Sequence, residues 1–142
     1  MDRIEKILRD QREELLSTDF TQFVSRKEEA EIDLNSKLAQ IVIGVRRCGK
    51  STLCQKVLVQ SNVNFAYVNF DDETLASLQS SQLNDVLEML YRVYGSFTHL
   101  FMDEIQNIAS WHLFVNRLLR QGIHLVVTGS NANLLSGELS TH

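Results

Sequence analysis

The sequence contains no proline, only two cysteines and few aromatic residues, and the lack of proline by itself excludes no function. The cysteines, Cys48 and Cys54, are too few for the disulfide framework of a small secreted domain, so we expect reduced thiols. No apolar run approaches the roughly 18 residues that a membrane-spanning helix needs. The first residues, MDRIEKILRDQREELL, are charged throughout and lack the apolar centre of a signal peptide. We therefore expect a cytoplasmic protein that does not associate with a membrane.

An excess of positive charge is also missing. The chain has 14 Lys and Arg residues against 18 Asp and Glu residues, a formal net charge of −4. A nucleic-acid partner is possible but gains no support from this balance, because such partners require a basic surface. The length of 142 residues suits one domain with a buried core. We divide the chain into an N-terminal helix with a connecting segment, residues 1–36, and a core, residues 37–142.

Short apolar runs alternate with amphipathic stretches along the chain. The apolar runs predict strands at 38–43, 64–70, 97–102 and 123–128, the first of them buried on both faces. The amphipathic stretches predict helices at 3–17, 50–60, 83–94 and 111–121, and a further helix is expected at 131–139. This alternation is typical of an α/β fold with a parallel sheet covered on both sides.

One motif carries specific chemistry. Residues 44–51 read GVRRCGKS and match the pattern G-x-x-x-x-G-K-[ST] of a phosphate-binding loop, or P-loop. Gly44 and Gly49 allow the tight turns that aim successive backbone N–H groups at an anion. Lys50 would reach the β- and γ-phosphates, and the hydroxyl of Ser51 is a hard oxygen ligand for Mg²⁺. The motif follows a predicted strand and opens a predicted helix, so we expect binding of ATP, or a similar nucleotide, with Mg²⁺.

The remaining positions of the loop are less specific. Arg46 and Arg47 either contact phosphate or a neighbouring subunit, or are solvated loop residues. We assign nucleotide binding to the whole loop and the residue after it: Gly44, Val45, Arg46, Arg47, Cys48, Gly49, Lys50, Ser51 and Thr52.

Two adjacent carboxylates, Asp103 and Glu104, follow the third predicted strand. In a parallel α/β sheet the carboxyl ends of the strands open onto the ligand crevice. Asp103 would therefore hold Mg²⁺ together with Ser51, and Glu104 would deprotonate the attacking water, with Lys50 as a further catalytic residue. A carboxylate in the position of Glu104 favours a hydrolase over a kinase of the same fold. The alternative is that the acidic pair merely begins a solvated helix.

Polar residues also end two other strands. Thr128, Ser130 and Asn131 follow the fourth strand, which we expect to lie between the P-loop strand and the Asp103 strand. Asn131, or next Ser130, would then sense the γ-phosphate or position water, although either residue is also a common helix N-cap. Asn69 ends the second strand, either restraining Glu104 or serving as a turn residue.

Taken together, GVRRCGKST, YVNFDDE, FMDEIQNIASWHLFVNRLLRQG and VVTGSNANLLSGELSTH resemble a family of predicted prokaryotic ATPases of the AAA+ superfamily. The resemblance implies a P-loop NTPase three-layer sandwich of the AAA+ (ASCE) type. It also implies a Walker A motif at residues 44–51, a Walker B motif at Asp103 and Glu104, and a sensor-1 position near Asn131. In that family an ATPase domain precedes a carboxy-terminal domain of unknown function.

The chain ends at His142, before the fifth strand, arginine finger and lid that the family implies. We therefore expect a core that is incomplete at its carboxyl end, slow hydrolysis, and self-association along the outer edge of the first strand. The leading functional hypothesis is ATP hydrolysis with Mg²⁺. A nucleotide-dependent regulatory switch with little turnover is the alternative, and a nucleic-acid motor is a third. The sequence does not identify a protein partner.

Overall fold

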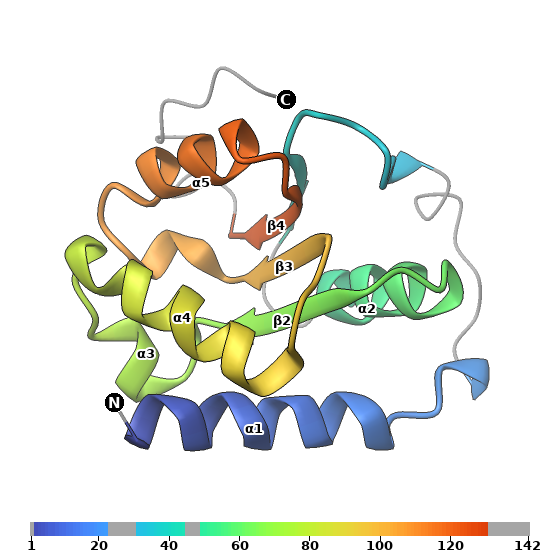
Figure 1. Cartoon of the computed structure of the whole chain (residues 1–142). Helices are drawn as coiled ribbons and strands as arrows, with labels where there is room; N and C mark the ends of the chain where they lie inside the picture. The colour runs from blue at the N-terminus through green and yellow to red at the C-terminus, as the bar shows by residue number, and fades with distance from the viewer. Residues whose placement is uncertain (1, 23–30, 45–48, 131–142) are drawn as a thin grey trace.

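Four parallel strands form the sheet at the centre of the protein in this computed structural model, which describes residues 2–22, 31–44 and 49–130 (Figure 1). The strands are β1 (Gln40–Ile43), β2 (Phe65–Asn69), β3 (His99–Asp103) and β4 (His124–Gly129). Their order is β1-β4-β3-β2, and every neighbouring pair is parallel. The predicted α/β class is confirmed, and β4 lies between β1 and β3 as the sequence led us to expect.

The helices begin and end within one or two residues of their predicted bounds. They are α1 (Asp2–Ser17), α2 (Lys50–Gln60), α4 (Leu83–Tyr94) and α5 (Trp111–Arg120). The short helix α3 (Glu73–Ala76) was not predicted, since four residues are too few to show a helical period. Three 3-10 turns complete the described elements: η1 (Phe20–Gln22), η3 (Ser80–Gln82) and η4 (Ile105–Asn107).

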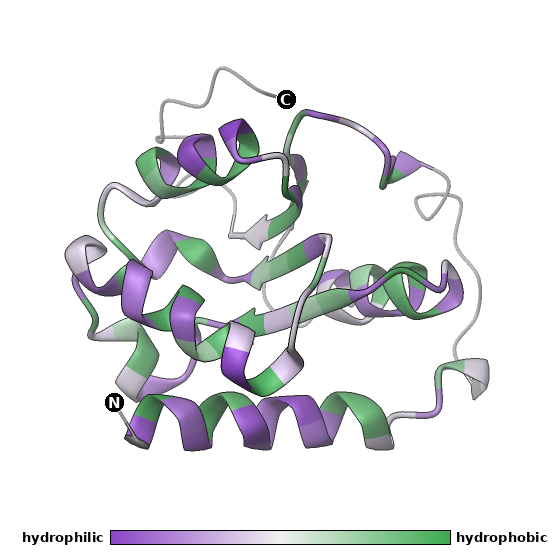
Figure 2. Cartoon of the chain, in the orientation of Figure 1, coloured by the Kyte–Doolittle hydropathy of each residue, from purple (hydrophilic) through white to green (hydrophobic). Residues whose placement is uncertain are grey.

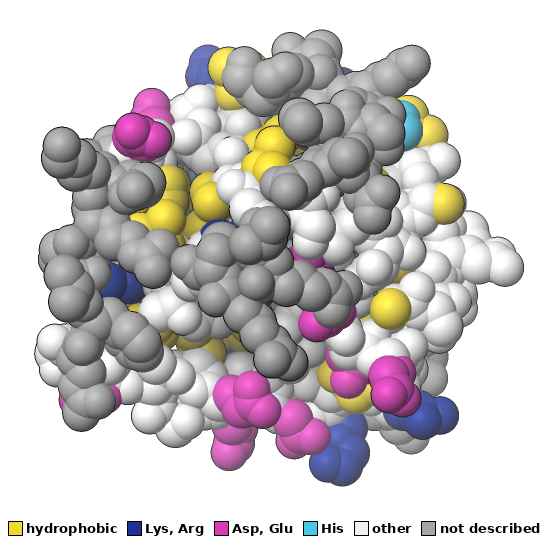
Figure 3. Space-filling view, turned by 180° about the vertical axis from the view of Figure 1, so that it is seen from behind, with side chains coloured by type: hydrophobic (Ala, Val, Ile, Leu, Met, Phe, Trp, Pro, Cys, Tyr) yellow, Lys and Arg dark blue, Asp and Glu magenta, His cyan; other side chains and the backbone are white. Residues whose placement is uncertain are grey.

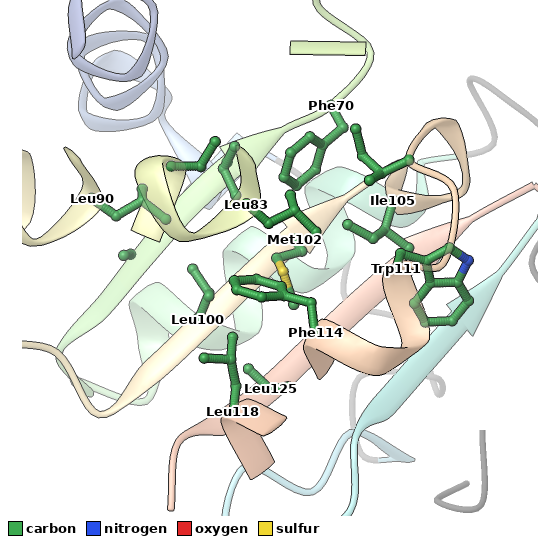
Figure 4. Packing of buried hydrophobic residues seen from close by; sticks show 14 of the residues in the cluster. Phe70, Leu83, Leu90, Leu100, Met102, Ile105, Trp111, Phe114, Leu118 and Leu125 are labelled. Carbon is green, nitrogen blue, oxygen red and sulfur yellow. The ribbon is translucent and has the colours of Figure 1, made fainter. Parts of the chain in front are cut away.

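Helices cover both faces of the sheet, which produces two apolar clusters. On one face α4 and α5 bury Phe70, Met102 and Phe114 in the larger cluster (Figure 4). On the other face α2 contributes Leu58, which packs in the same cluster as Phe101. Residues that alternate along β3 therefore enter opposite clusters, as the two-residue period of a strand requires. All five residues of β3 are buried, so its carboxyl end is firmly positioned.

Helix α1 lies along the outer edge of β2 and also packs against α4 (Figure 1). Its apolar and charged residues alternate with the helical period (Figure 2). The carboxamide of Gln11 imitates a neighbouring strand: its Nε2 donates to the carbonyl of Asn69, and its Oε1 accepts from the Asn69 N–H, both at 3.1 Å. Seen from behind, acidic side chains gather along the lower part of the molecule (Figure 3). Helix α1 therefore protects the outer edge of β2, which would otherwise offer unpaired backbone groups.

The first strand differs from its prediction. The sequence favoured a strand buried on both faces, but three residues of β1 are only half-buried and Ile43 is 38% exposed. The reason is its position in the sheet. Within the described part of the chain, β1 is an edge strand and pairs only with β4. The expected helix at 131–139 lies outside the described residues. None of the described helices is long and apolar enough to cross a membrane.

Candidate nucleotide site

The candidate site lies at the carboxyl end of the sheet, where parallel strands bring their last residues to one edge. Asn69 pairs with Asp103, and Ile43 pairs with Gly129. The N–H of Gly44 donates to the carbonyl of Gly129 at 3.3 Å, so the first residue of the P-loop motif is fixed beside the tip of β4. Three motifs that are far apart in the sequence therefore meet at this edge.

Helix α2 points its amino terminus at the same edge. Gly49 forms the N-cap of this helix with φ of 88°, a left-handed conformation that favours glycine. Lys50 and Ser51 are the first two residues of the helix. The free N–H groups and the partial positive charge of a helix amino terminus attract anions. The glycine of the motif thus permits the turn that directs Lys50 and Ser51 to the site.

Three hydroxyl groups surround the carboxylate of Asp103. Ser51 Oγ donates to Oδ2 at 2.5 Å, and the Tyr67 hydroxyl donates to the same oxygen at 2.8 Å. Thr128 Oγ1 donates to Oδ1. We call Ser51, Tyr67 and Thr128 the hydroxyl cluster. Asp103 is 2% exposed, so these bonds replace the water that its charge would otherwise require.

Glu104 follows directly but has different partners. Its Oε2 lies 2.7 Å from Lys50 Nζ, and its Oε1 accepts from Gln106 Nε2 at 2.8 Å. Ser130 Oγ lies 3.4 Å from the same Oε1. The backbone of Glu104 has φ of 54°, a left-handed conformation that is uncommon for a residue with a side chain. Its N–H donates to Thr128 Oγ1 at 3.1 Å, which secures this conformation.

A cavity of about 390 Å³ connects the two carboxylates with the start of α2. It is lined by Gly49, Lys50, Ser51, Thr52, Asn69, Asp71, Asp103 and Glu104. The ammonium of Lys50 is the only cation among these lining residues, and it is 5% exposed. The cavity thus combines one buried ammonium, hydroxyl groups and carboxylates at a helix amino terminus, a combination suited to an anionic ligand with a cation.

Two buried groups beside the site have altered acidity. Burial, and then the negative charge of Asp103, raises the pKa of the Cys54 thiol to about 12, while Lys50 opposes this effect. The same two causes raise the pKa of the Tyr67 hydroxyl. Tyr67 is therefore a protonated donor to Asp103, and Cys54 is a protonated, unreactive thiol.

The oxygen atoms of Ser51 and Asp103 form the part of the site that fits a metal ion. The described residues contain no group of three or more His, Cys, Asp or Glu side chains that would hold a metal by themselves. One carboxylate and one hydroxyl are instead the donor set of Mg²⁺, which keeps several waters and takes its other ligands from phosphate.

The predicted site residues divide into three groups, and the first is Gly44, which the structure describes beside the tip of β4 but which does not line the cavity. Those that the structure brings together around one cavity are Gly49, Lys50, Ser51, Thr52, Asp103 and Glu104. Those that lie outside the described residues are Val45, Arg46, Arg47, Cys48 and Asn131. Asn69 lines the cavity, but its side-chain oxygen accepts from the N–H of Asp71 at 2.9 Å, which is the role of a turn residue.

Besides Asp71, which lines the cavity, sequence reasoning missed two residues that contact the carboxylates of the site. Tyr67 resembles any aromatic residue of a buried strand, and only its register beside β3 reveals that its hydroxyl reaches Asp103. Gln106 lies two residues after Glu104 in what looks like a polar loop, and its contact depends on the left-handed turn at Glu104. The only feature of the sequence that could have indicated Gln106 is that a polar residue closely follows the acidic pair.

One family model and several known proteins are similar to this chain. The sequence profile of the AAA domain family matches residues 36–142. An uncharacterized protein of Methanocaldococcus jannaschii is 37% identical over 112 residues, which cover 78% of this chain and 25% of that protein. One from Haemophilus influenzae is 35% identical over 112 residues, covering 72% of this chain and 28% of that protein. The chain thus spans about a quarter of the length of these relatives.

Among solved structures, the fold is similar to that of a DNA replication initiation factor, with a TM-score of 0.52 and 16% sequence identity. The match covers 88% of this chain and 45% of the other. At this identity the similarity concerns the fold alone.

Proposed function

Since the chain belongs to the AAA domain family and has the P-loop fold of a nucleotide-binding module, we propose that it binds ATP with Mg²⁺ and hydrolyses it. The observation that carries the proposal is a pair of contacts. Lys50 and Ser51 are consecutive at the start of α2, Asp103 and Glu104 are consecutive at the end of β3, and each residue of one pair contacts one of the other. All four border the cavity of about 390 Å³.

Binding is the task of α2 and its first side chains. The helix amino terminus attracts the phosphate groups, and the Lys50 ammonium neutralises their charge. Phosphate in the cavity would compete with Glu104 for that ammonium, since Lys50 Nζ lies 2.7 Å from Glu104 Oε2. Ser51 and Asp103 would hold Mg²⁺, which when bound neutralises the charge that develops on the phosphate oxygens.

Hydrolysis requires a base, and Glu104 is the carboxylate in position to act as one. Its side chain borders the cavity while Gln106 and Ser130 fix one of its oxygens. A carboxylate held in one orientation can accept the proton of an attacking water. Asp103 is less suited to this role because its carboxylate lies against Ser51 and, with that hydroxyl, forms the part of the site that fits a metal ion.

The test uses two substitutions in the full-length protein. Lys50→Ala should weaken ATP binding at least tenfold, about 1.4 kcal/mol, because the phosphates lose their buried cation. Glu104→Gln should retain ATP affinity but lower the rate of phosphate release by about 10²–10⁴, because an amide cannot accept a proton. Calorimetry measures the first effect, and steady-state phosphate release measures the second.

Matched controls are available on the surface. Lys6→Ala removes an exposed lysine of α1, and Glu88→Gln changes an exposed carboxylate of α4. Both controls should bind and hydrolyse ATP like the wild type. Unchanged ATP affinity in Lys50→Ala would refute the binding site. Tight binding with no turnover by the wild type would instead support the second candidate, a nucleotide-dependent switch.

A further inference from the structure

The turn that follows Glu104 is tied to both neighbouring strands. Asn107 Nδ2 donates to the carbonyl of Phe70, just beyond the end of β2, at 3.0 Å. On the other side, Gln106 Oε1 accepts from the N–H of Ser130, just beyond the end of β4, at 3.3 Å. The short helix η4 is therefore held between two strand tips, and this fixes the position of Gln106.

The carboxamide of Gln106 both donates and accepts a hydrogen bond. Its Nε2 donates to Glu104 Oε1 at 2.8 Å while its Oε1 accepts from the backbone of Ser130. A carboxylate could make only the second contact, because it has no N–H to donate. An apolar side chain of similar size could make neither. Glutamine is thus chemically required for both contacts at once.

These contacts complete the restraint on Glu104. Lys50 approaches Oε2 and Gln106 approaches Oε1, so the carboxylate is held from both sides. If phosphate withdraws Lys50, Oε1 keeps its contacts with Gln106 and with the more distant Ser130 hydroxyl. The side-chain contact with Gln106 is the shorter of the two, and the left-handed turn at Glu104 brings the residues together.

From this arrangement we infer that Gln106 is a positioning residue, which orients Glu104 for proton transfer and couples it to the tip of β4. The inference rests on the proposed hydrolysis of ATP. A base that is misplaced by about 1 Å can lose roughly 10²-fold in rate. Gln106 therefore affects the rate of the chemical step and not the affinity for nucleotide.

Two substitutions in the full-length protein separate the two contacts. Gln106→Met removes both hydrogen bonds at nearly constant size. Gln106→Glu keeps the acceptor for the Ser130 N–H but replaces the donor to Glu104 with a repelling oxygen. Both variants should lower kcat for ATP at least tenfold, with Gln106→Glu affected at least as strongly. The KM for ATP and the affinity for ADP should stay within threefold of the wild type.

A second measurement does not depend on turnover. Affinity for ADP with fluoroaluminate, which imitates the transition state, should fall at least tenfold in both variants while affinity for ADP alone is retained. The controls are Gln121→Met and Gln121→Glu, which make the same changes at an exposed residue after α5 and should leave all values unchanged.

The outcomes distinguish the two proposals. Wild-type turnover with normal kcat in Gln106→Glu would overturn the positioning role and leave ATP hydrolysis intact. A joint loss of kcat, ADP affinity and melting temperature would also overturn it, because that pattern indicates a purely structural role. Absence of turnover in the wild type would refute the proposed hydrolysis and the positioning role together.

Discussion

Asp103 and Glu104 are neighbours in the sequence, but their carboxylates occupy two different surroundings. The three neutral donors of the hydroxyl cluster hold Asp103, whereas a cation and an amide hold Glu104. Neutral donors fix a carboxylate and leave its full negative charge available to a metal ion. Lys50, at 2.7 Å, instead balances the negative charge of Glu104. An anion that attracts Lys50 would therefore change the surroundings of the Glu104 carboxylate.

Thr128 links the two surroundings, so changing it should have the largest effect on stability. Its hydroxyl donates to Asp103 and accepts from the N–H of Glu104, and the side chain is fully buried. Thr128→Val leaves both groups short of a partner and should lower the free energy of unfolding by about 2–4 kcal/mol. Urea denaturation measures this loss. Thr98→Val, at an exposed threonine, should cost about 1 kcal/mol or less.

Tyr67 belongs to the Asp103 side alone, and its removal should have a smaller effect. Tyr67→Phe deletes one of three donors to the carboxylate, at a cost of about 2 kcal/mol in the free energy of unfolding. ATP affinity should stay within threefold, because Ser51 and Thr128 still hold Asp103. The matched variant Tyr91→Phe, at a tyrosine that is 42% exposed, should be nearly neutral in the same denaturation experiment. A tenfold loss of ATP affinity in Tyr67→Phe would mean that the cluster tunes binding directly.

The available charge of Asp103 should appear in the dependence of ATP binding on Mg²⁺. Asp103→Asn should weaken binding about tenfold, or 1.4 kcal/mol, with Mg²⁺ present and should change it little without Mg²⁺. Calorimetry with and without the metal measures both values, and Asp10→Asn on the exposed face of α1 is the control. If Glu104→Gln removed the benefit of Mg²⁺ instead, the roles of the two carboxylates would be reversed.

The smallest expected effect concerns Cys54 of α2, because the charge of Asp103 affects the pKa of its thiol. Burial raises its pKa to about 12, and Asp103 contributes in the same direction. Below that pH the thiol of the folded protein stays protonated, so alkylation at pH 8 should be slow and should accelerate on unfolding. Peptide mapping by mass spectrometry separates Cys54 from Cys48. Asp103→Asn should lower the pKa slightly, and rapid alkylation of the folded wild type would contradict the burial of Cys54.

Much of the fold was predictable because the spacing of apolar residues indicates helices and strands locally. The helical spacing of Trp111, Phe114 and Leu118 predicted α5, and the apolar run around Phe101 predicted β3. The apolar run of β1 did not reveal the exposure of its side chains, and the open outer edge of this strand was expected only from the family resemblance. An apolar run looks the same whether its strand lies inside a sheet or at an edge, and only the strand order decides between them.

The candidate site was predictable to the extent that its residues belong to one local motif. Lys50 and Ser51 follow a glycine that permits a left-handed turn, and the pair Asp103 and Glu104 comes at the end of an apolar strand. These patterns span a few residues, so the amino-acid sequence alone indicated them. That they border one cavity is a property of the parallel sheet, which aligns the carboxyl ends of its strands.

The sequence by itself determined the α/β alternation, the P-loop motif and the presence of two adjacent carboxylates. Only the tertiary structure decided which partner each carboxylate has. A hydrogen bond requires two atoms to meet within about 3 Å, and Tyr67 and Thr128 are 36 and 25 residues from Asp103 in the chain. Strand register brings them together, and the left-handed backbone of Glu104 then turns the next carboxylate toward Lys50 and Gln106.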